Sequence, residues 1–236
     1  VDIKQLINKF GFNLSDRDHE AIARIYQAFY QSGMEVRYVI RDRPMPSNRY
    51  FPSYRSILFK RQDSPIESLS ELPGRKVAFE RRGSTTAYMV PRAELETAGF
   101  RLHELAAAND QPAPEEIGYI FAGSENNIVV WVHRRLVDIG AFSDIDWDQL
   151  EDMPPVLKKD LAILHYSAPL PRALLIGRHG LRPEVELAVR RVLLAAAGDP
   201  QGALLLRNYK NVTRYDELTG DAAASVAAAR RLIGGP

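Results

Sequence analysis

The chain of 236 residues contains no cysteine. Disulfides, thiolate metal sites and cysteine nucleophiles are therefore excluded. No run of about 18 apolar residues is present, so no segment has the pattern of a membrane-spanning helix. The first residues, Val1–Lys4, do not resemble a signal peptide, and an exported protein would therefore be represented here by a processed or trimmed chain.

An excess of either charge is also missing. The chain has 31 lysines and arginines against 30 aspartates and glutamates, which leaves a formal net charge of +1. Such a chain has no global field that would attract nucleic acid or an acidic membrane, and we expect no nucleic-acid partner. Its 45% of hydrophobic residues is ordinary for a globular protein that buries a substantial core, and its length allows one or two domains.

Motifs of catalysis and metal binding are scarce as well. None of the five histidines stands at ligand spacing from another histidine or a carboxylate, as in H-E-x-x-H, so we expect no metal site. The G-x-S-x-G elbow and the P-loop are absent, and no base is indicated for Ser84 as a nucleophile. We therefore predict no enzyme activity and no cofactor. The histidines are His19, His103, His133, His165 and His179.

The most informative stretch that is present is Gly74–Pro91. The short apolar run Val77–Phe79 indicates a buried strand, and Ala87–Val90 begins a helical pattern. Between them lie a glycine and three hydroxyl residues, Gly83–Thr86. Free backbone N–H groups and the positive end of a helix meet in such a turn, and short hydroxyls add donors, so the turn favours an anion site. The alternative is that Ser84 only caps the helix.

Segments further along the chain extend this pattern to a family resemblance, which covers roughly Tyr54 to Tyr215. Their order and spacing resemble the phosphate, phosphite and phosphonate substrate-binding proteins of ABC transporters, the PhnD-like periplasmic binding proteins. The matching segments are Tyr54–Leu58, Asp63–Ile66, Leu72–Phe79, Gly83–Pro91, Ala122–Asn127, Val137–Ala141 and Tyr166–Arg172.

The resemblance implies an α/β protein of the two-lobed, type 2 periplasmic-binding-protein architecture. We expect residues 1–71 in lobe one, 72–167 in lobe two, and 168–236 returning to lobe one with the C-terminal helices. The strand-helix-strand unit that opens the family is not evident in residues 1–53, so that this part of lobe one is either missing or diverged. The alternation of strand and helix patterns in the chain also predicts a mainly parallel sheet.

Apolar patterns place the individual elements. The expected strands cover 36–40, 57–59, 77–79, 137–142, 161–165 and 174–176. The expected helices cover 15–33, 66–72, 87–98, 124–132, a segment from 183, 203–206 and 222–233. Pro91 should kink the third of these helices or confine its first part to about one turn.

The resemblance also marks the residues of a ligand site. Ser84, Thr85 and Thr86 match the family's hydroxyl-rich loop, which holds phosphoryl oxygens in its members. The resemblance places Tyr54 where relatives have a tyrosine of the cleft. A phenol can donate to an oxyanion while its ring packs on the ligand. A half-buried strand tyrosine without a ligand role is the alternative for Tyr54.

A second turn departs from the family pattern. Ser124, Glu125 and Asn126 align with the motif G-S-H-D/E-A, but Glu125 replaces the histidine and Asn126 the acidic residue. A carboxylate that faces an anion costs free energy unless the ligand also carries a cation, as a phosphonate with an amino group does. Alternatively, Glu125 is an ordinary helix-start residue that is favoured by the helix dipole.

Ser143 and Asp144 complete the set of candidates, because they follow the expected strand 137–142. Ligands of open α/β sheets bind beyond the carboxyl ends of strands. A solvated loop aspartate without a ligand role is the alternative for Asp144.

We expect a monomeric solute-binding protein on the periplasmic or extracellular side of a bacterial membrane. It would capture a small anionic ligand, a phosphonate, phosphite or phosphate ester, in a cleft that closes over it, and would then dock on the membrane subunits of an ABC transporter. Three alternatives stay open: a sensor domain of a receptor or kinase, an enzyme of the same fold that acts on a small anionic metabolite, and a degenerate lobe that binds only protein.

Overall fold

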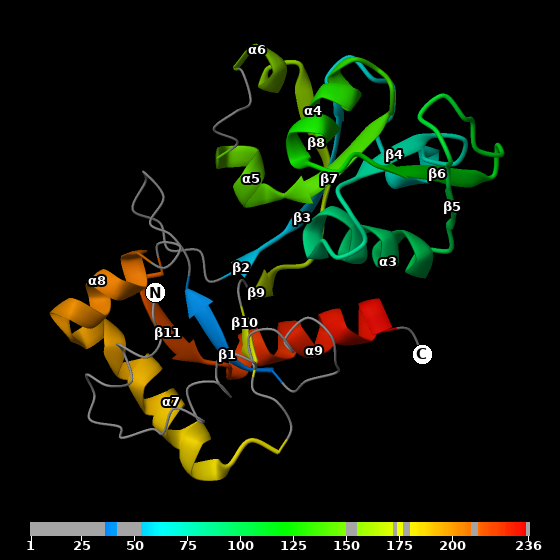
Figure 1. Cartoon of the computed structure of the whole chain (residues 1–236). Helices are drawn as coiled ribbons and strands as arrows, with labels where there is room; N and C mark the ends of the chain where they lie inside the picture. Colours follow the sequence, from blue (N-terminus) through cyan, green and yellow to red (C-terminus); the bar gives the residue numbers. More distant parts are fainter. Residues whose placement is uncertain are drawn as a thin grey trace. The chain divides into compact units, whose positions relative to one another are not determined.

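The computed structural model describes residues 36–41, 53–149, 155–171, 174–176, 180–208 and 212–234 (Figure 1). The chain divides into two compact units. One consists of Val1–Ser53 and Pro171–Ala224, the other of Tyr54–Leu170 and Ser225–Pro236. The lobe boundaries expected from the sequence, at 71/72 and 167/168, fall inside the second of these units. The helix expected over residues 15–33 lies outside the described residues.

The unit that begins at Tyr54 is built on a six-stranded sheet with the strand order β5-β6-β4-β7-β3-β8. The pairs β5–β6, β6–β4 and β4–β7 are parallel, whereas β3 is antiparallel to both β7 and β8. The strands are β3 (Ser56–Arg61), β4 (Lys76–Phe79), β5 (Arg101–Glu104), β6 (Glu116–Phe121), β7 (Ile139–Ser143) and β8 (Leu161–Tyr166). The expectation of a mainly parallel sheet is confirmed with β3 as the exception, because β3 enters the unit beside the end of β7 and therefore runs antiparallel to both of its neighbours.

Helices cover both faces of this sheet, so its central strands are apolar on both sides. Alternate residues of one strand point to opposite faces. In β3, Ile57 and Phe59 accordingly pack with the core on the side of α4 (Glu125–His133), whereas Leu58 packs with the core on the side of α3 (Val90–Thr97). All three of these side chains are fully or almost fully buried.

The helix expected over 87–98 begins with an unusually wide turn. Residues Thr85–Met89 form a π-helix, η2, and α3 continues from Val90 to Thr97 with Pro91 in its first turn. The expectation that Pro91 confines the first part of the helix to about one turn is confirmed. The backbone bond from the Met89 N–H to the Ser84 carbonyl, at 2.9 Å, spans five residues and sets the wide pitch of this turn.

The remaining elements of the same unit are short. They are the 3₁₀-helix η1 (Leu69–Glu71), α5 (Asp144–Gln149) and α6 (Pro155–Lys158). The predicted strands at 57–59, 77–79, 137–142 and 161–165 are confirmed with small shifts of their ends, and so is the helix over 124–132. β5 and β6 were not foreseen. β5 is an exposed edge strand with one apolar residue, Leu102, and therefore carries no alternating pattern.

The unit that holds Pro171–Ala224 contains a three-stranded antiparallel sheet in the order β10-β1-β11. Its elements are β1 (Val36–Arg41), β10 (Leu174–Ile176), α7 (Pro183–Ala195), η3 (Ala196–Gly198), α8 (Pro200–Asn208) and β11 (Arg214–Glu217). A core of Val192, Ala196, Leu206, Val212 and Tyr215 joins these helices to β11. The strands expected at 36–40 and 174–176 and the helices from 183 and over 203–206 are confirmed.

Three further elements lie where the chain passes between the units. β2 (Ser53–Tyr54) pairs with β9 (Leu170–Pro171), and the C-terminal α9 runs over Gly220–Gly234, as expected for residues 222–233. Among the described residues, no helix is long and apolar enough to cross a membrane.

Candidate functional site

Three neighbouring parallel strands, β6, β4 and β7, have their carboxyl ends together. This end of the six-stranded sheet is the carboxyl edge. The turns that follow Phe121, Phe79 and Ser143 therefore lie side by side, with the turn after β4 in the middle. The register of the antiparallel neighbour β3 pairs Ser56 with Ser143, which places Tyr54 at this edge as well. The sheet thus gathers all the sequence-predicted site residues at the edge where open α/β sheets bind ligands.

The hydroxyl turn, Ser84–Thr86, lies at the centre of this edge. The Ser84 Oγ accepts a hydrogen bond from the Ala87 N–H at 3.3 Å, and the interpretation of Ser84 as a helix cap is therefore confirmed. This bond occupies only the acceptor side of the hydroxyl. The Ser84 proton has no acceptor within the described part of the chain, and the cap is thus compatible with donation to a ligand.

Thr85 and Thr86 add further donors next to Ser84. Thr85 is exposed and Thr86 is 6% exposed, and neither hydroxyl has a hydrogen-bond partner among the residues that the structure describes. Their backbone N–H groups belong to the first turn of the helix, where no preceding carbonyl of the helix can accept them. The positive end of the helix dipole lies at the same place. Hydroxyls and amides that suit an oxyanion therefore converge on this turn.

A second turn lies beside the hydroxyl turn. Gly123 has a φ of 79°, which suits glycine, and it precedes Ser124, the cap of α4, whose Oγ accepts from the Asn127 N–H at 3.2 Å. Glu125 is the half-buried first residue of α4, and Asn126 is exposed. The position of Glu125 agrees with its interpretation as a helix-start residue. A contact between Glu125 and a cationic group of the ligand stays a prediction.

Glu80 joins the two turns, and sequence reasoning missed it. The Glu80 N–H donates to the Ala87 carbonyl at 3.2 Å, and the Glu80 carbonyl accepts from the Gly123 N–H at 3.0 Å. Its carboxylate is 16% exposed and lies 3.3 Å from the Nε of Arg81. The available signal was the position of Glu80 directly after a buried strand, because residues at that position lie at the carboxyl edge of the sheet.

Ser143 and Asp144 hold the end of β7 against the start of β3. Ser143 is 1% exposed, and its Oγ contacts the carboxylate of Asp146 and accepts from the Asp146 N–H at 3.1 Å. The Asp144 Oδ1 accepts from the Arg55 N–H at 2.9 Å. Burial raises the pKa of Asp144 above its ordinary value, against the lowering effect of the Arg55 N–H. The interpretation of Asp144 as a solvated loop residue is wrong, because it begins α5 and is half-buried.

Tyr54 is half-buried and ends the short strand β2, with one residue, Arg55, between it and the start of β3. This agrees with the half-buried strand tyrosine that the sequence left open. Because Tyr54 lies at the carboxyl edge, it remains a candidate. Its contact with a ligand stays a prediction, and the same holds for Ser124, Asn126, Ser143 and Asp144.

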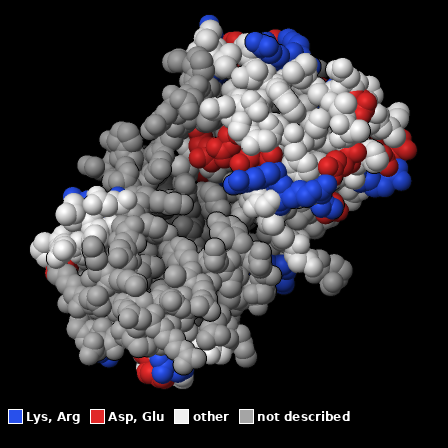
Figure 2. Space-filling model, viewed as in Figure 1, with Lys and Arg blue, Asp and Glu red and all other residues white. Residues whose placement is uncertain are grey.

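Two cationic side chains near this edge, Arg81 and Arg82, are paired with carboxylates. Arg82 follows Arg81 in the turn after β4, forms an ion pair with Glu104, and lies over the ring of Phe121 with its Cζ 5.1 Å from the ring centroid. The hydrogen bond to Glu104 raises the pKa of Arg82. Figure 2 shows such positive and negative groups side by side on the surface of this unit. The guanidinium of Arg55, beside Tyr54, donates to the Ser167 carbonyl at 3.2 Å, whereas the hydroxyl turn itself offers an anion neutral donors.

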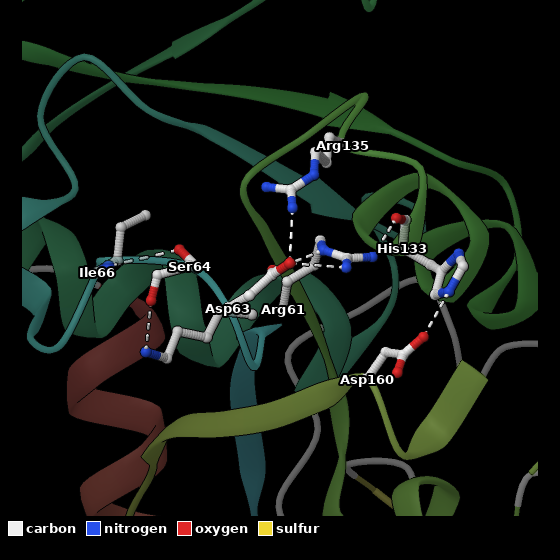
Figure 3. A network of polar contacts seen from close by, with 8 residues as sticks. Arg61, Asp63, Ser64, Ile66, His133, Arg135 and Asp160 are labelled. Carbon is white, nitrogen blue, oxygen red and sulfur yellow. Dashed lines mark hydrogen bonds and ion pairs between the residues drawn. The ribbon is translucent and has the colours of Figure 1, made fainter. Parts of the chain in front are cut away.

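A second polar cluster lies at the opposite edge of the sheet (Figure 3). Arg61 binds both carboxylate oxygens of Asp63, at 2.8 and 2.9 Å, and donates to the His133 carbonyl at 2.7 Å. Arg135 donates to Asp63 at 2.7 Å, and the His133 ring lies 3.1 Å from the carboxylate of Asp160. Because these groups satisfy one another around the end of α4, this cluster is structural. Within the described part of the chain, no group of three His, Cys, Asp or Glu residues is arranged to hold a metal ion.

Comparison with known proteins assigns the fold and the family. The family model described as "ABC transporter, phosphonate, periplasmic substrate-binding protein" matches residues 14–223. The chain belongs to this family. A structure of XAC2383 from Xanthomonas citri, bound to ATP, is 34% identical, with a TM-score of 0.76 over 84% of this chain and 71% of that one.

Two more distant structures share the fold of this phosphonate-family protein. One is a binding-protein component of an ABC phosphonate transporter from Pseudomonas aeruginosa, 18% identical, with a TM-score of 0.53 over 89% of this chain and 71% of that one. The other is PhnD1 from Prochlorococcus marinus in complex with methylphosphonate, 12% identical, with a TM-score of 0.52 over 84% of this chain and 71% of that one.

These findings confirm the resemblance seen in the sequence and the type 2 periplasmic-binding-protein fold, with a mixed sheet. They support a solute-binding role for this substrate-binding protein and do not favour the sensor or enzyme alternatives. The family implies an extracytoplasmic location and work together with components of an ABC transporter.

Proposed function

We propose that this substrate-binding protein captures a small phospho-oxyanion, a phosphonate or a phosphate ester, at the carboxyl edge of the sheet in the unit that begins at Tyr54. The observation that carries the proposal is the hydroxyl turn, where Ser84, Thr85 and Thr86 present protons without an acceptor among the described residues at the start of a helix. The phosphoryl oxygens would be held by these hydroxyls and by the free amides of the first turn.

Neutral donors suit a protein that must also release its ligand. Hydrogen bonds to a charged group contribute about 1.5–3 kcal/mol each, so that three or four of them supply useful affinity without a permanent counter-charge. The candidates Tyr54, Ser124, Asn126 and Asp144 would line the same edge around the ligand, whereas the buried Ser143 would support this edge through Asp146.

Glu125 and Glu80 decide which phosphonate fits best. Both are half-buried acids beside the hydroxyl turn. A carboxylate there repels a simple anion but attracts an ammonium group, so an aminophosphonate satisfies both ends of the site. We therefore propose 2-aminoethylphosphonate as a better ligand than methylphosphonate.

A nucleotide is the second candidate, because the 34% identical protein from Xanthomonas citri was solved with ATP bound. The hydroxyl turn would then hold a phosphate of the nucleotide. In either case the protein would act as a monomer that closes over its ligand, docks on the membrane subunits of an ABC transporter and performs no catalysis.

The test is a ligand screen by thermal shift followed by titration calorimetry. The panel is phosphate, phosphite, methylphosphonate, 2-aminoethylphosphonate, ATP and sulfate. A specific ligand at 100 times its Kd should stabilise the fold by about 2.7 kcal/mol. Stabilisation by phosphonates and not by sulfate supports the proposal, stabilisation by ATP alone selects the nucleotide, and no stabilisation by any of them overturns it.

A substitution at the turn ties the binding to these residues. Thr85→Val removes an exposed hydroxyl and keeps the shape of the side chain, so Kd should rise roughly tenfold or more while stability stays nearly unchanged. Thr97→Val, the same change at the other end of α3, is the matched control and should leave Kd unchanged. Equal affinities of the two variants would place the ligand elsewhere.

A further inference from the structure

The carbonyl of Thr86 has lost its donor within the helix. Two N–H groups of the wide turn donate to carbonyls five residues earlier: Met89 donates to Ser84, and Val90 donates to Thr85. The next bond of this series would run from residue 91 to Thr86. Residue 91 is a proline, which has no N–H. The Thr86 carbonyl therefore needs a donor from outside the helix.

Ser56 supplies that donor. Its Oγ donates to the Thr86 carbonyl at 2.6 Å, and Ser56 is 1% exposed. A buried carbonyl without a partner is costly, so this bond stabilises the wide turn alongside the backbone bonds within it. Ser56 lies 30 residues before Thr86 in the sequence, at the start of β3.

Ser56 is itself fixed on its other side. Its N–H donates to the Ser167 Oγ at 2.9 Å, and its carbonyl accepts from the Ser167 N–H at 2.9 Å. The Ser167 hydroxyl donates onward to the Ala168 carbonyl at 2.8 Å, and Ser167 is 1% exposed. These bonds fix the backbone of Ser56, from which its hydroxyl donates to the Thr86 carbonyl.

We propose that Ser56 is a positioning residue for ligand binding, which acts through the Thr86 carbonyl and fixes the wide turn in the conformation that presents the hydroxyls and amides of Thr85 and Thr86. This inference rests on the proposed function of the hydroxyl turn. Ser56 need not touch the ligand, and its effect differs from that of the three hydroxyl residues, which donate directly.

The test is a double-mutant cycle with Ser56→Ala and Pro91→Ala. Ser56→Ala leaves the Thr86 carbonyl without a donor, and Kd should rise at least about tenfold. Pro91→Ala restores an N–H at the position that the series of bonds requires. In the double variant this N–H replaces the serine hydroxyl, so most of the lost affinity should return. A merely structural loss at Ser56 would not be rescued from residue 91.

The probe is whichever of methylphosphonate, 2-aminoethylphosphonate and ATP the unsubstituted chain binds, measured by titration calorimetry. Ile66→Val, a conservative change in the core of the same unit, serves as a control for lost stability and should leave Kd unchanged. Undiminished affinity of Ser56→Ala overturns the inference while the proposed function stands. Lost affinity without rescue by Pro91→Ala overturns the route through Thr86. If the unsubstituted chain binds none of the probes, the proposed function fails and the inference falls with it.

Discussion

Two arginines hold the carboxylate of Asp63, which is a residue-scale effect with a consequence in acid. The hydrogen bond from Arg61 lowers the pKa of Asp63 from its ordinary 3.8 to about 2, and the charge of Arg135 adds to the effect. When the folded pKa is depressed, the contribution to stability is present above the unfolded pKa and is lost as the pH falls through the folded pKa. The affected window therefore runs from about pH 4 down to about pH 2.

Asp63→Asn should remove this part of the acid sensitivity. Between about pH 4 and pH 2 the free energy of unfolding of the variant should fall less steeply than that of the unsubstituted chain. Urea unfolding at a series of pH values measures the two slopes. Glu96→Gln removes another exposed carboxylate, which forms an ion pair with Arg92, and is the matched control. Identical slopes for Asp63→Asn and the unsubstituted chain would contradict the pairing.

The pKa of Asp144 is raised rather than lowered, so its effect on stability has the opposite dependence on pH from that of Asp63. Because burial raises its pKa, the folded state holds the proton more tightly than the unfolded state, and stability from this group declines as the pH rises through the folded pKa. Asp144→Asn can still accept from the Arg55 N–H and carries no charge. The variant should be as stable as the unsubstituted chain at neutral pH or more stable, as measured by thermal unfolding, and a clear loss there would show that the carboxylate charge is needed.

At the scale of elements, close approach decides which residues the sheet accepts. Gly140 in β7 lies between the ring of Phe59 and the side chain of Ile128, and an added Cβ would overlap with both. Gly140→Ala should therefore destabilise the unit by about 1–3 kcal/mol, as overpacking of a core does. Gly123→Ala is the comparison for backbone strain. An added Cβ at Gly123 would meet no atom within 4 Å, so the cost of this substitution would come from its φ of 79°, which disfavours alanine.

Gly202 plays the same part in the other unit. A Cβ at this position of α8 would overlap with the backbone carbonyl of Ala196, which cannot turn aside as a side chain can. Gly140 lies in the unit that begins at Tyr54, and Gly202 lies in the unit that holds Pro171–Ala224. Their alanine variants therefore report on the stability of the two units separately.

For the whole molecule, these variants test whether the two compact units unfold together. Each unit has a core of its own, and chains with more than one such unit often depart from two-state unfolding. We expect calorimetry to show two overlapping transitions, of which Gly140→Ala lowers one and Gly202→Ala the other. A ligand of the hydroxyl turn should raise the transition that Gly140→Ala lowers. A single transition that both variants shift equally would contradict this expectation.

Local signals in the sequence determined much of this protein. Apolar runs located β3, β4 and β7, because strands that are buried on both faces need continuous apolar residues. The hydroxyls before a helical pattern located the Ser84 cap, and Pro91 indicated the break in the helix. The order of several weak motifs placed the chain in its family. These features depend on neighbours in the sequence and can be read without the fold.

Only the tertiary structure decided how distant residues meet. The antiparallel entry of β3 and the exposed edge strand β5 leave no periodic pattern, so neither was predictable. Ser56 and Ser167 lie in segments that match the family, but no pattern there indicates that they bond to each other or to Thr86. The roles of these two serines and of Glu80 come from hydrogen bonds between residues distant in the sequence. The sequence determined which segments hold hydroxyls and where helices begin. The fold determined which carbonyl lacks a donor and which buried serine provides it, because such a bond depends on strands that are adjacent in space and not in the chain.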